Sequence, residues 1–211
     1  MNQDYTHISI IIDRSGSMQN GWNDVVGGYE SIIKKQKKQP GKCTLTVAAF
    51  DNDYELVEDF TDIQKVNEKL LVSPRGMTAL LDAIGKTING VGEKLAALSE
   101  EDRPAKVVFQ VQTDGQENAS REFTCGAIKQ LIEKQTNNYN WQFIFLGADL
   151  SSVEQAKNWG FDINNVTTYN TKNYGATMEF MNCKMTMARS CVSSDLATTM
   201  AVTNEEKTAI N

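Results

Sequence analysis

Three short, nearly continuous runs of apolar residues, set far apart in the chain, most constrain its fold. They are His7–Ile12, Lys106–Gln112 and Trp141–Gly147, and each ends at turn-forming or acidic residues. Successive side chains of a strand point to opposite faces of a sheet, so a strand that is apolar throughout is covered on both faces. The three runs therefore predict the middle of a mostly parallel sheet.

Segments with helical periodicity separate these runs. Their apolar residues recur three or four positions apart, which places one apolar stripe along each predicted helix. The predicted helices cover Trp22–Lys38, Met77–Leu98, Arg121–Lys134, Ser151–Trp159 with Ser151 as its N-cap, and Gly175–Met200. Strands that alternate with helices are typical of a sheet with helices on both sides.

A hairpin is predicted at one edge of the sheet. The strand-like runs Cys43–Phe50 and Tyr54–Phe60 flank the turn residues Asp51-Asn52-Asp53, and a short strand is expected at Asn165–Tyr169. The predicted fold class is α/β, a Rossmann-like three-layer sandwich with a central, mostly parallel sheet, one antiparallel edge strand and helices on both faces. The chain of 211 residues is expected to be one domain, with a core over about residues 6–200 and a frayed tail over 201–211.

Charge and histidine content exclude several classes of function. Asp and Glu number 27 against 21 Lys and Arg, a formal net charge of -6 that disfavours binding to nucleic acid or an anionic membrane. His7 is the single histidine, so neither a histidine-based catalytic triad nor a zinc site with several histidines is expected. The apolar run before Asp13 is too short for a secretory signal, no run is long enough to span a membrane, and the four cysteines are scattered. We therefore expect a cytoplasmic protein.

Oxygen-bearing side chains follow two of the central strands and precede one helix. Asp13, Ser15 and Ser17 come after the first apolar run, Asp114 comes after the second, and Thr78 stands at the start of a predicted helix. In an open α/β sheet such loops meet at the carboxyl edge of the strands. Two carboxylates and three hydroxyls, without thiol or imidazole, form a ligand set for a hard divalent cation. Mg²⁺ is the expected ion, with Mn²⁺ and Ca²⁺ as alternatives.

This set resembles the metal-ion-dependent adhesion site (MIDAS) of the von Willebrand factor type A (VWA) domain. That family has Asp-x-Ser-x-Ser after its first strand, a later Thr, and an Asp after its fourth strand. The segments SIIIDRSGSM, RGMTALLDAI and VVFQVQTDGQEN are similar to it in order and surroundings, and the resemblance covers about residues 6–200. It implies the same fold and a metal held by Asp13, Ser15, Ser17, Thr78 and Asp114.

The resemblance also implies a function. In such domains a Glu or Asp carboxylate of a partner protein completes the coordination of the metal, so the chain is expected to be a protein-binding module and not an enzyme. It is most similar to the small bacterial and phage members of the family. Some relatives switch between forms through motion of the last helix, for which Gly175–Met200 is the counterpart here, although its methionines are expected to pack in the core.

Other interpretations are compatible with the sequence. A phosphohydrolase of the haloacid dehalogenase type also carries Asp after its first strand, but its motif needs a second Asp where Ser15 stands. A cation that only ties the loops together is a second alternative. In a third, Ser15, Ser17 and Thr78 are helix caps and Asp114 is a turn residue. Among the neighbours, Arg14 is expected in solvent, Met18 in the core, and Asp82 at nearby backbone groups or solvent.

Overall fold

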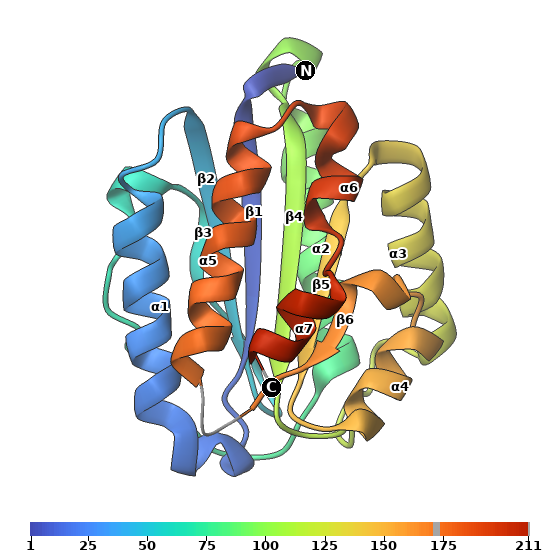
Figure 1. Cartoon of the computed structure of the whole chain (residues 1–211). Coiled ribbons are helices and arrows are strands. Elements are labelled where there is room, and N and C mark those ends of the chain that lie inside the picture. Colours follow the sequence, from blue (N-terminus) through green and yellow to red (C-terminus); the bar gives the residue numbers. More distant parts are fainter. Residues whose placement is uncertain (171–173, 211) are drawn as a thin grey trace.

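The computed structural model describes residues 1–170 and 174–210. Within them, six strands form one sheet in the order β3-β2-β1-β4-β5-β6. The strands are β1 (Asn2–Asp13), β2 (Lys42–Phe50), β3 (Tyr54–Asp62), β4 (Pro104–Thr113), β5 (Gln142–Gly147) and β6 (Val166–Thr168). The three apolar runs are β1, β4 and β5, which are neighbours inside the sheet (Figure 1).

The sheet is parallel except at one edge. β1 pairs in parallel with β2 and β4, β5 pairs in parallel with β4 and β6, and β3 runs antiparallel to β2. The register places Ile10 of β1 beside Val47 of β2 and Gln110 of β4. The predicted mostly parallel sheet with one antiparallel edge strand is confirmed.

Helices cover both faces of this sheet, as predicted. In Figure 1, α1, α5, α6 and α7 lie in front of the sheet, and α2 lies behind it. The helices are α1 (Trp22–Gln36), α2 (Leu80–Ala97), α3 (Cys125–Tyr139), α4 (Leu150–Asn158), α5 (Tyr174–Ser190), α6 (Leu196–Met200) and α7 (Asn204–Ile210). None of the described helices has the length and apolarity needed to cross a membrane.

Two apolar cores, one on each face, follow from the alternation of side chains along β1. Ile8, Ile10 and Ile12 pack with residues of α1, α5 and α6, whereas Ile11 packs with residues of α2, α3 and α4. Trp22 belongs to the first core. So do most of the methionines of α5, as expected: Met178, Met181 and Met185 are buried, and Met187 is exposed.

The C-terminal part of the chain differs from the prediction. Instead of one helix over Gly175–Met200, α5 ends at Ser190 and α6 begins at Leu196. The frayed tail predicted for 201–211 is wrong for 204–210, which form α7 and bury Ile210. Residue 211 lies outside the described residues. Burial of the Ile210 side chain favours an ordered helix here despite the polar composition of the segment.

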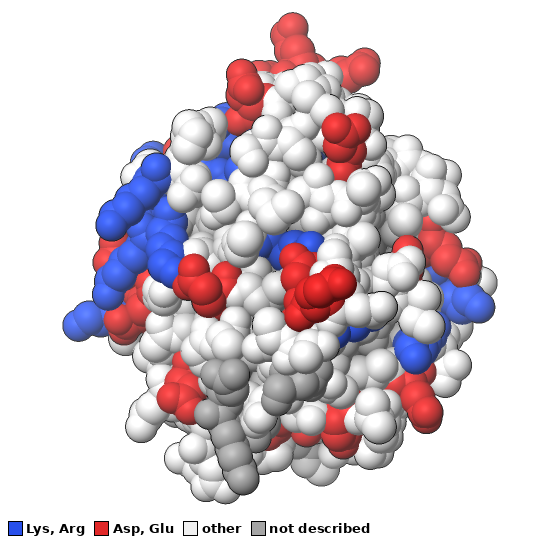
Figure 2. All heavy atoms as spheres, viewed as in Figure 1, with Lys and Arg blue, Asp and Glu red and all other residues white. Residues whose placement is uncertain are grey.

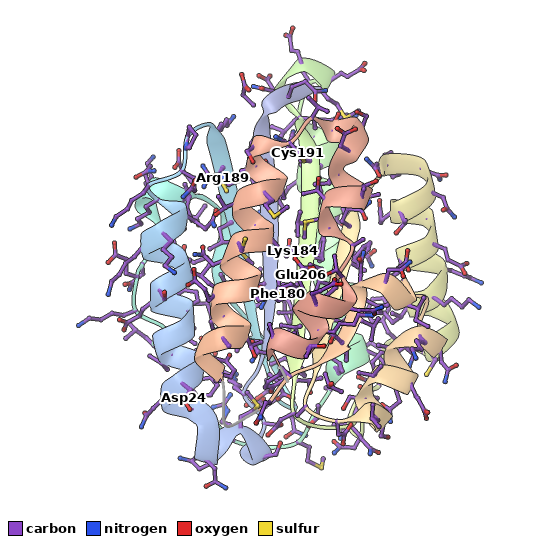
Figure 3. The ribbon with its side chains drawn as sticks, viewed as in Figure 1. Asp24, Phe180, Lys184, Arg189, Cys191 and Glu206 are labelled. Atoms are coloured by element: carbon purple, nitrogen blue, oxygen red, sulfur yellow. The ribbon has the colours of Figure 1, made fainter. Side chains whose placement is uncertain are left out.

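Three buried cations, Lys106, Lys184 and Arg189, bind groups at or near the ends of helices, and Figure 3 labels Lys184 and Arg189. Lys106 of β4 donates to the carbonyl oxygens of Arg189 and Cys191 at 2.7 and 3.0 Å, where α5 ends. Lys184 forms an ion pair of 2.9 Å with Glu206 of α7. Positive charge is favourable at the carbonyl end of a helix. The Arg189 guanidinium acts in the same way after α1, where it donates to the carbonyl oxygens of Gln36, Gln39, Pro40 and Gly41.

Lysines gather on the exposed side of α1, on the left in Figure 2. Lys34 pairs with Glu30 at 3.4 Å, Lys37 pairs with Glu68 at 3.2 Å, and Lys35 pairs with Glu179 of α5. Exposed ion pairs of this kind contribute little to stability. The basic run at the end of α1 is a solvated face with acidic neighbours.

The predicted N-cap Ser151 is wrong. The cap of α4 is Asp149, two residues earlier, whose carboxylate accepts the Ser152 N–H at 2.7 Å. Asp and Ser are comparable caps, so composition alone does not choose between them.

Candidate metal centre

Three loops meet at the carboxyl edge of the sheet, the lower edge in Figure 1. β1 ends at Asp13 and leads into a short 3-10 helix, Gly16–Gly21. β4 ends at Thr113, one residue before Asp114. The third loop precedes α2 and joins the first through the Gly16 N–H, which donates to the Gly76 carbonyl at 3.1 Å. The topology therefore brings all five predicted ligands to one edge.

The five side chains form one cluster. The hydroxyls of Ser15 and Ser17 lie 3.0 Å apart, and Ser17 donates to a carboxylate oxygen of Asp114 at 2.6 Å. Gly115 connects Thr78 to this cluster, because a Cβ placed on that glycine would lie 3.2 Å from Thr78 Oγ1 and 3.6 Å from Ser17 Oγ. The missing side chain keeps the space between these hydroxyls open.

Asp13 is the most enclosed member of the cluster and has no exposed surface. Its two oxygens accept hydrogen bonds from the Thr113 hydroxyl at 2.5 Å and the Ser15 N–H at 2.7 Å. Burial, and to a smaller extent the nearby Asp114, raise the pKa of Asp13 to about 6, against the lowering effect of the hydrogen bonds from Thr113 and Ser15. Burial also raises the pKa of Asp114. Both carboxylates are therefore in an environment that favours an added positive charge.

The chemistry of the donor set fits a hard divalent cation. Within residues 1–170 and 174–210, no Lys or Arg forms an ion pair with Asp13 or Asp114. In the same described part of the chain, no three His, Cys, Asp or Glu side chains converge on one point. The available oxygens are two carboxylates and three hydroxyls, which suit Mg²⁺ or Mn²⁺ better than a thiolate or imidazole site would.

The structure does not support helix capping as the role of these residues. Ser15 precedes the 3-10 helix but makes no side-chain cap hydrogen bond. Thr78 lies two residues before α2, whose N-cap position is Ala79. The backbone of Thr78 is instead held by Asn118, which accepts the Thr78 N–H at 2.9 Å and donates its own N–H to the Thr78 carbonyl. The hydroxyls of Ser15 and Thr78 therefore do not cap these helices.

Three predictions about neighbouring residues have different outcomes. Asp82 binds backbone groups, as expected: its carboxylate accepts the N–H groups of Arg121, Glu122 and Phe123 at 2.9 to 3.0 Å. The expectation that Arg14 is solvated is wrong, because its side chain is buried and lies 3.2 Å from Asp51 Oδ2. Met18 is buried in the first core, as expected.

Several residues around the centre were missed by sequence reasoning. Thr113 holds Asp13, Asn118 holds Thr78, and Glu117 accepts N–H groups of Leu81, Ala119 and Ser120 between 2.7 and 2.9 Å. Thr113, Glu117 and Asn118 belong to the segment VVFQVQTDGQEN, whose family-like composition was the only signal for them. Their partners lie about forty residues or more away along the chain, except for Ala119 and Ser120, so periodicity could not identify the contacts.

A polar pocket of about 440 Å³ lies by the start of α2, and none of the five candidate ligands lines it. It is bounded by Asn52 and Tyr54 after β2, Lys86 on α2, and Arg121 before α3. A larger cavity of about 510 Å³ lies between α2 and α3 next to Trp141. Trp141 directly precedes β5, so this cavity is at the opposite edge of the sheet, away from the five oxygen ligands.

Comparison with solved structures finds the same architecture in other proteins. The von Willebrand factor domain of the type V pili tip protein Mfa5 from Porphyromonas gingivalis is 12% identical, with a TM-score of 0.66 over 85% of this chain and 94% of that one. The VWA2 paralog of ArnB from Sulfolobus acidocaldarius is 18% identical, with a TM-score of 0.57 over 87% of this chain and 45% of that one.

Proximal thread matrix protein 1 from the mussel byssus is a further neighbour, in a structure with a zinc-occupied MIDAS motif. It is 16% identical, with a TM-score of 0.60 over 86% of this chain and 46% of that one, so the chain spans about half the length of this protein. No protein-family model and no curated protein sequence matches the chain. At these identities the likeness establishes architecture alone, and it agrees with the resemblance carried by the sequence motifs: this protein has the von Willebrand factor type A fold.

Proposed function

We propose that this protein is a metal-dependent protein-binding module. A divalent cation, Mg²⁺ in our proposal, is held by Asp13, Ser15, Ser17, Thr78 and Asp114, and a Glu or Asp carboxylate of a partner protein binds to it. The observation that carries the proposal is the cluster of these five side chains around Gly115, with two carboxylates that no described Lys or Arg neutralises. The zinc-occupied MIDAS of the mussel protein supports the same use of the fold.

The chain's own residues prepare the site for such an ion. The Thr113 hydroxyl and the Ser15 N–H fix both oxygens of Asp13, so its orientation does not depend on the metal. The Ser17 hydroxyl holds Asp114 on the opposite side. When bound, the cation supplies positive charge that attracts a carboxylate, and Gly115 leaves room beside the Thr78 and Ser17 hydroxyls.

An enzymatic role is not part of the proposal. Ser15 stands where a haloacid dehalogenase-type phosphohydrolase needs its second Asp, and a serine hydroxyl cannot replace that carboxylate as acid and base. The single histidine, His7, lies on β1 and bonds Thr44 and Ser9, six residues away from Asp13. We also propose that the protein acts in the cytoplasm, since its four cysteines, Cys43, Cys125, Cys183 and Cys191, are free thiols.

The first test is a calorimetric titration of chelator-treated protein with Mg²⁺, Mn²⁺ and Ca²⁺. We expect one saturable site, lost in Ser15→Ala and Asp114→Asn. A matched control exists at the opposite edge of the sheet, where Ser99 donates to Asp102 at 2.7 Å. Ser99→Ala and Asp102→Asn should bind the ion as the wild type does. Equal binding by the two pairs of variants would contradict the assigned ligands.

Gly115→Ala tests the open space in the cluster. The added methyl would lie 3.2 Å from Thr78 Oγ1, and Gly115 has no positive φ, so the backbone tolerates alanine. We expect Mn²⁺ affinity to fall by roughly tenfold, the lower end of what disturbed ligand orientation costs. The chelated protein should unfold at the same temperature as the wild type. Unchanged affinity would show that this space is not where the ion binds.

Peptide selection tests the partner and separates the alternatives. A random-peptide display library is selected on the protein in Mn²⁺, in chelator, and on Ser15→Ala in Mn²⁺. We expect enrichment of Asp- or Glu-containing peptides only on wild type with metal, and loss of binding when that residue becomes Asn or Gln. Metal binding without any such peptide favours a purely structural ion. Hydrolysis of p-nitrophenyl phosphate that is lost in Asp13→Asn would favour the phosphohydrolase.

A further inference from the structure

The turn between β2 and β3 lies next to the metal centre but contributes none of the five proposed ligands. Its residues are Asp51, Asn52 and Asp53, and the parallel register of β1 and β2 places Phe50 directly beside Asp13. The Arg14 N–H donates to the Phe50 carbonyl at 2.8 Å. The turn is therefore a direct neighbour of the loop that carries Ser15 and Ser17.

Asp51 contacts both of the loops that it lies between. Its side chain, 1% exposed, accepts the Arg75 Nε–H at 2.6 Å and lies 3.2 Å from Arg14 Nε. Its carbonyl oxygen accepts the Ala79 N–H at 2.9 Å. Asp51 thus forms an ion pair with Arg14, in the segment after Asp13, and hydrogen bonds with Arg75 and Ala79, on either side of Thr78.

The side chain of Asn52 also connects this turn to the loop that contains Thr78. Asn52 Oδ1 accepts the Met77 N–H at 2.8 Å, directly before Thr78. Gly76 has φ +69°, and a Cβ there would lie 2.4 Å from the same oxygen, so only glycine fits between them. The Gly76 carbonyl in turn accepts the Gly16 N–H, between the two serine ligands. The contacts run without a gap from Asn52 to both metal-binding loops.

We infer that Asp51 and Asn52 are positioning residues that set the spacing between the Asp13–Ser17 loop and Thr78. The inference rests on the proposed metal site and extends it to residues outside the motif. A small cation requires its ligands within a few tenths of an ångström, and partners that orient ligands commonly change metal affinity by 10- to 100-fold. The turn provides such partners for two loops at once.

Asn52→Ala is the decisive variant, because Asn52 is exposed and its removal changes no charge. We expect Mn²⁺ affinity, measured by titration of the chelated protein, to fall by roughly 3- to 10-fold, the loss of one hydrogen bond. Asn52→Asp keeps the acceptor oxygen and should restore the slow amide exchange of Met77 in chelator, a measurement that does not depend on the attraction of its added charge for the cation. An Asn52→Ala affinity within twofold of wild type, or no recovery of this slow exchange in Asn52→Asp, would overturn the role of Asn52.

Asp51→Asn needs a control for the loss of negative charge near a cation. Asp53→Asn provides this control, because Asp53 lies in the same turn and its side chain is 75% exposed. The only ion pair described for Asp53 is with Arg75, at 3.4 Å. We expect the affinity of Asp51→Asn for Mn²⁺ to fall by roughly tenfold and that of Asp53→Asn by less than threefold. Equal losses would mean that Asp51 acts through its charge alone and not by positioning.

Amide hydrogen exchange in chelator separates this inference from the proposed function. In the metal-free protein, Asn52→Ala should speed exchange at Gly16, Met77 and Ala79, whose N–H groups bond within this network, and not at Ile10 in β1. If the wild type binds no ion, the proposed function fails, and faster exchange at the three amides still supports positioning of the loops. Unchanged exchange at all three overturns it.

Discussion

His7 lies in the middle of the fold and gives the protein a specific weakness toward acid. Its side chain has no exposed surface, Nδ1 lies 2.9 Å from Thr44 Oγ1, Nε2 lies 3.1 Å from Ser9 Oγ, and the ring stacks on Phe60 at 4.5 Å. Burial lowers the pKa of His7 from 6.5 to about 3. The partners are hydroxyls and an aromatic ring, so none of them offsets the cost of a buried positive charge.

The direction and size of the change in stability with pH follow from the pKa of His7 in the unfolded and the folded chain. The unfolded chain binds a proton on His7 near pH 6.5 and the folded chain only near pH 3, so stability is complete above about pH 7 and falls between these values. At about 1.4 kcal/mol for each unit of pKa difference, the loss is about 2 kcal/mol by pH 5 and about 5 kcal/mol below pH 3.

The loss of stability toward acid can be measured by urea unfolding. The wild type and His7→Gln are compared in chelator at pH 7.5 and at pH 5. Glutamine does not titrate and keeps a donor and an acceptor for Thr44 and Ser9. We expect the wild type to lose about 2 kcal/mol more than His7→Gln between the two pH values. Because His7 is the single histidine, its imidazole proton NMR signal is unambiguous and should not shift between pH 8 and pH 5. A native-state titration near pH 6, or equal pH dependence of both proteins, refutes the reasoning.

Two further predictions concern packing. Glu206→Gln removes the ion pair of buried Lys184, so we expect the free energy of unfolding in urea to fall by about 1–3 kcal/mol; no change would mean that α7 is not docked. Helix propensity predicts that Gly85→Ala and Gly90→Ala each stabilise α2 by up to about 1 kcal/mol. The structure allows this only for Gly90, which has open space, since a Cβ on Gly85 would lie 2.5 Å from the Phe123 ring. Thermal melts should therefore rise for Gly90→Ala and fall for Gly85→Ala, and a rise in both would contradict the packing argument.

The candidate site could be predicted from sequence because its residues stand at the ends of predicted elements. Asp13 and Asp114 follow apolar strands, and parallel strands end at the same edge, so their proximity follows from element order. The residues that hold them in place could not be found in this way. Arg14 directly follows Asp13, and its burial is favourable only because the tertiary structure places Asp51, in the turn after β2, and Glu55 of β3 beside it.

The C-terminal segment shows the same limit of prediction from sequence. Its composition is polar, and the pattern of Gly175–Met200 is compatible with one continuous helix. The structure ends α5 at Ser190, where Lys106 of β4 binds its last carbonyl groups, and docks α7 through Lys184. Each of these contacts joins residues that are distant in sequence, and the energy of burying a lysine depends on its partner.

Periodicity and strand-end chemistry, read from the sequence alone, predicted the sheet, its antiparallel edge and the five candidate oxygen ligands, because each of these is marked by residues close in the chain to the start or end of one element. Tertiary structure alone decided which carboxylates and cations are buried, where the last helices end, and how the turn at Asp51 and Asn52 contacts the two loops that carry Ser15, Ser17 and Thr78. Those outcomes depend on desolvation and on hydrogen bonds between distant segments. Such energies exist only once the sheet has brought the segments together.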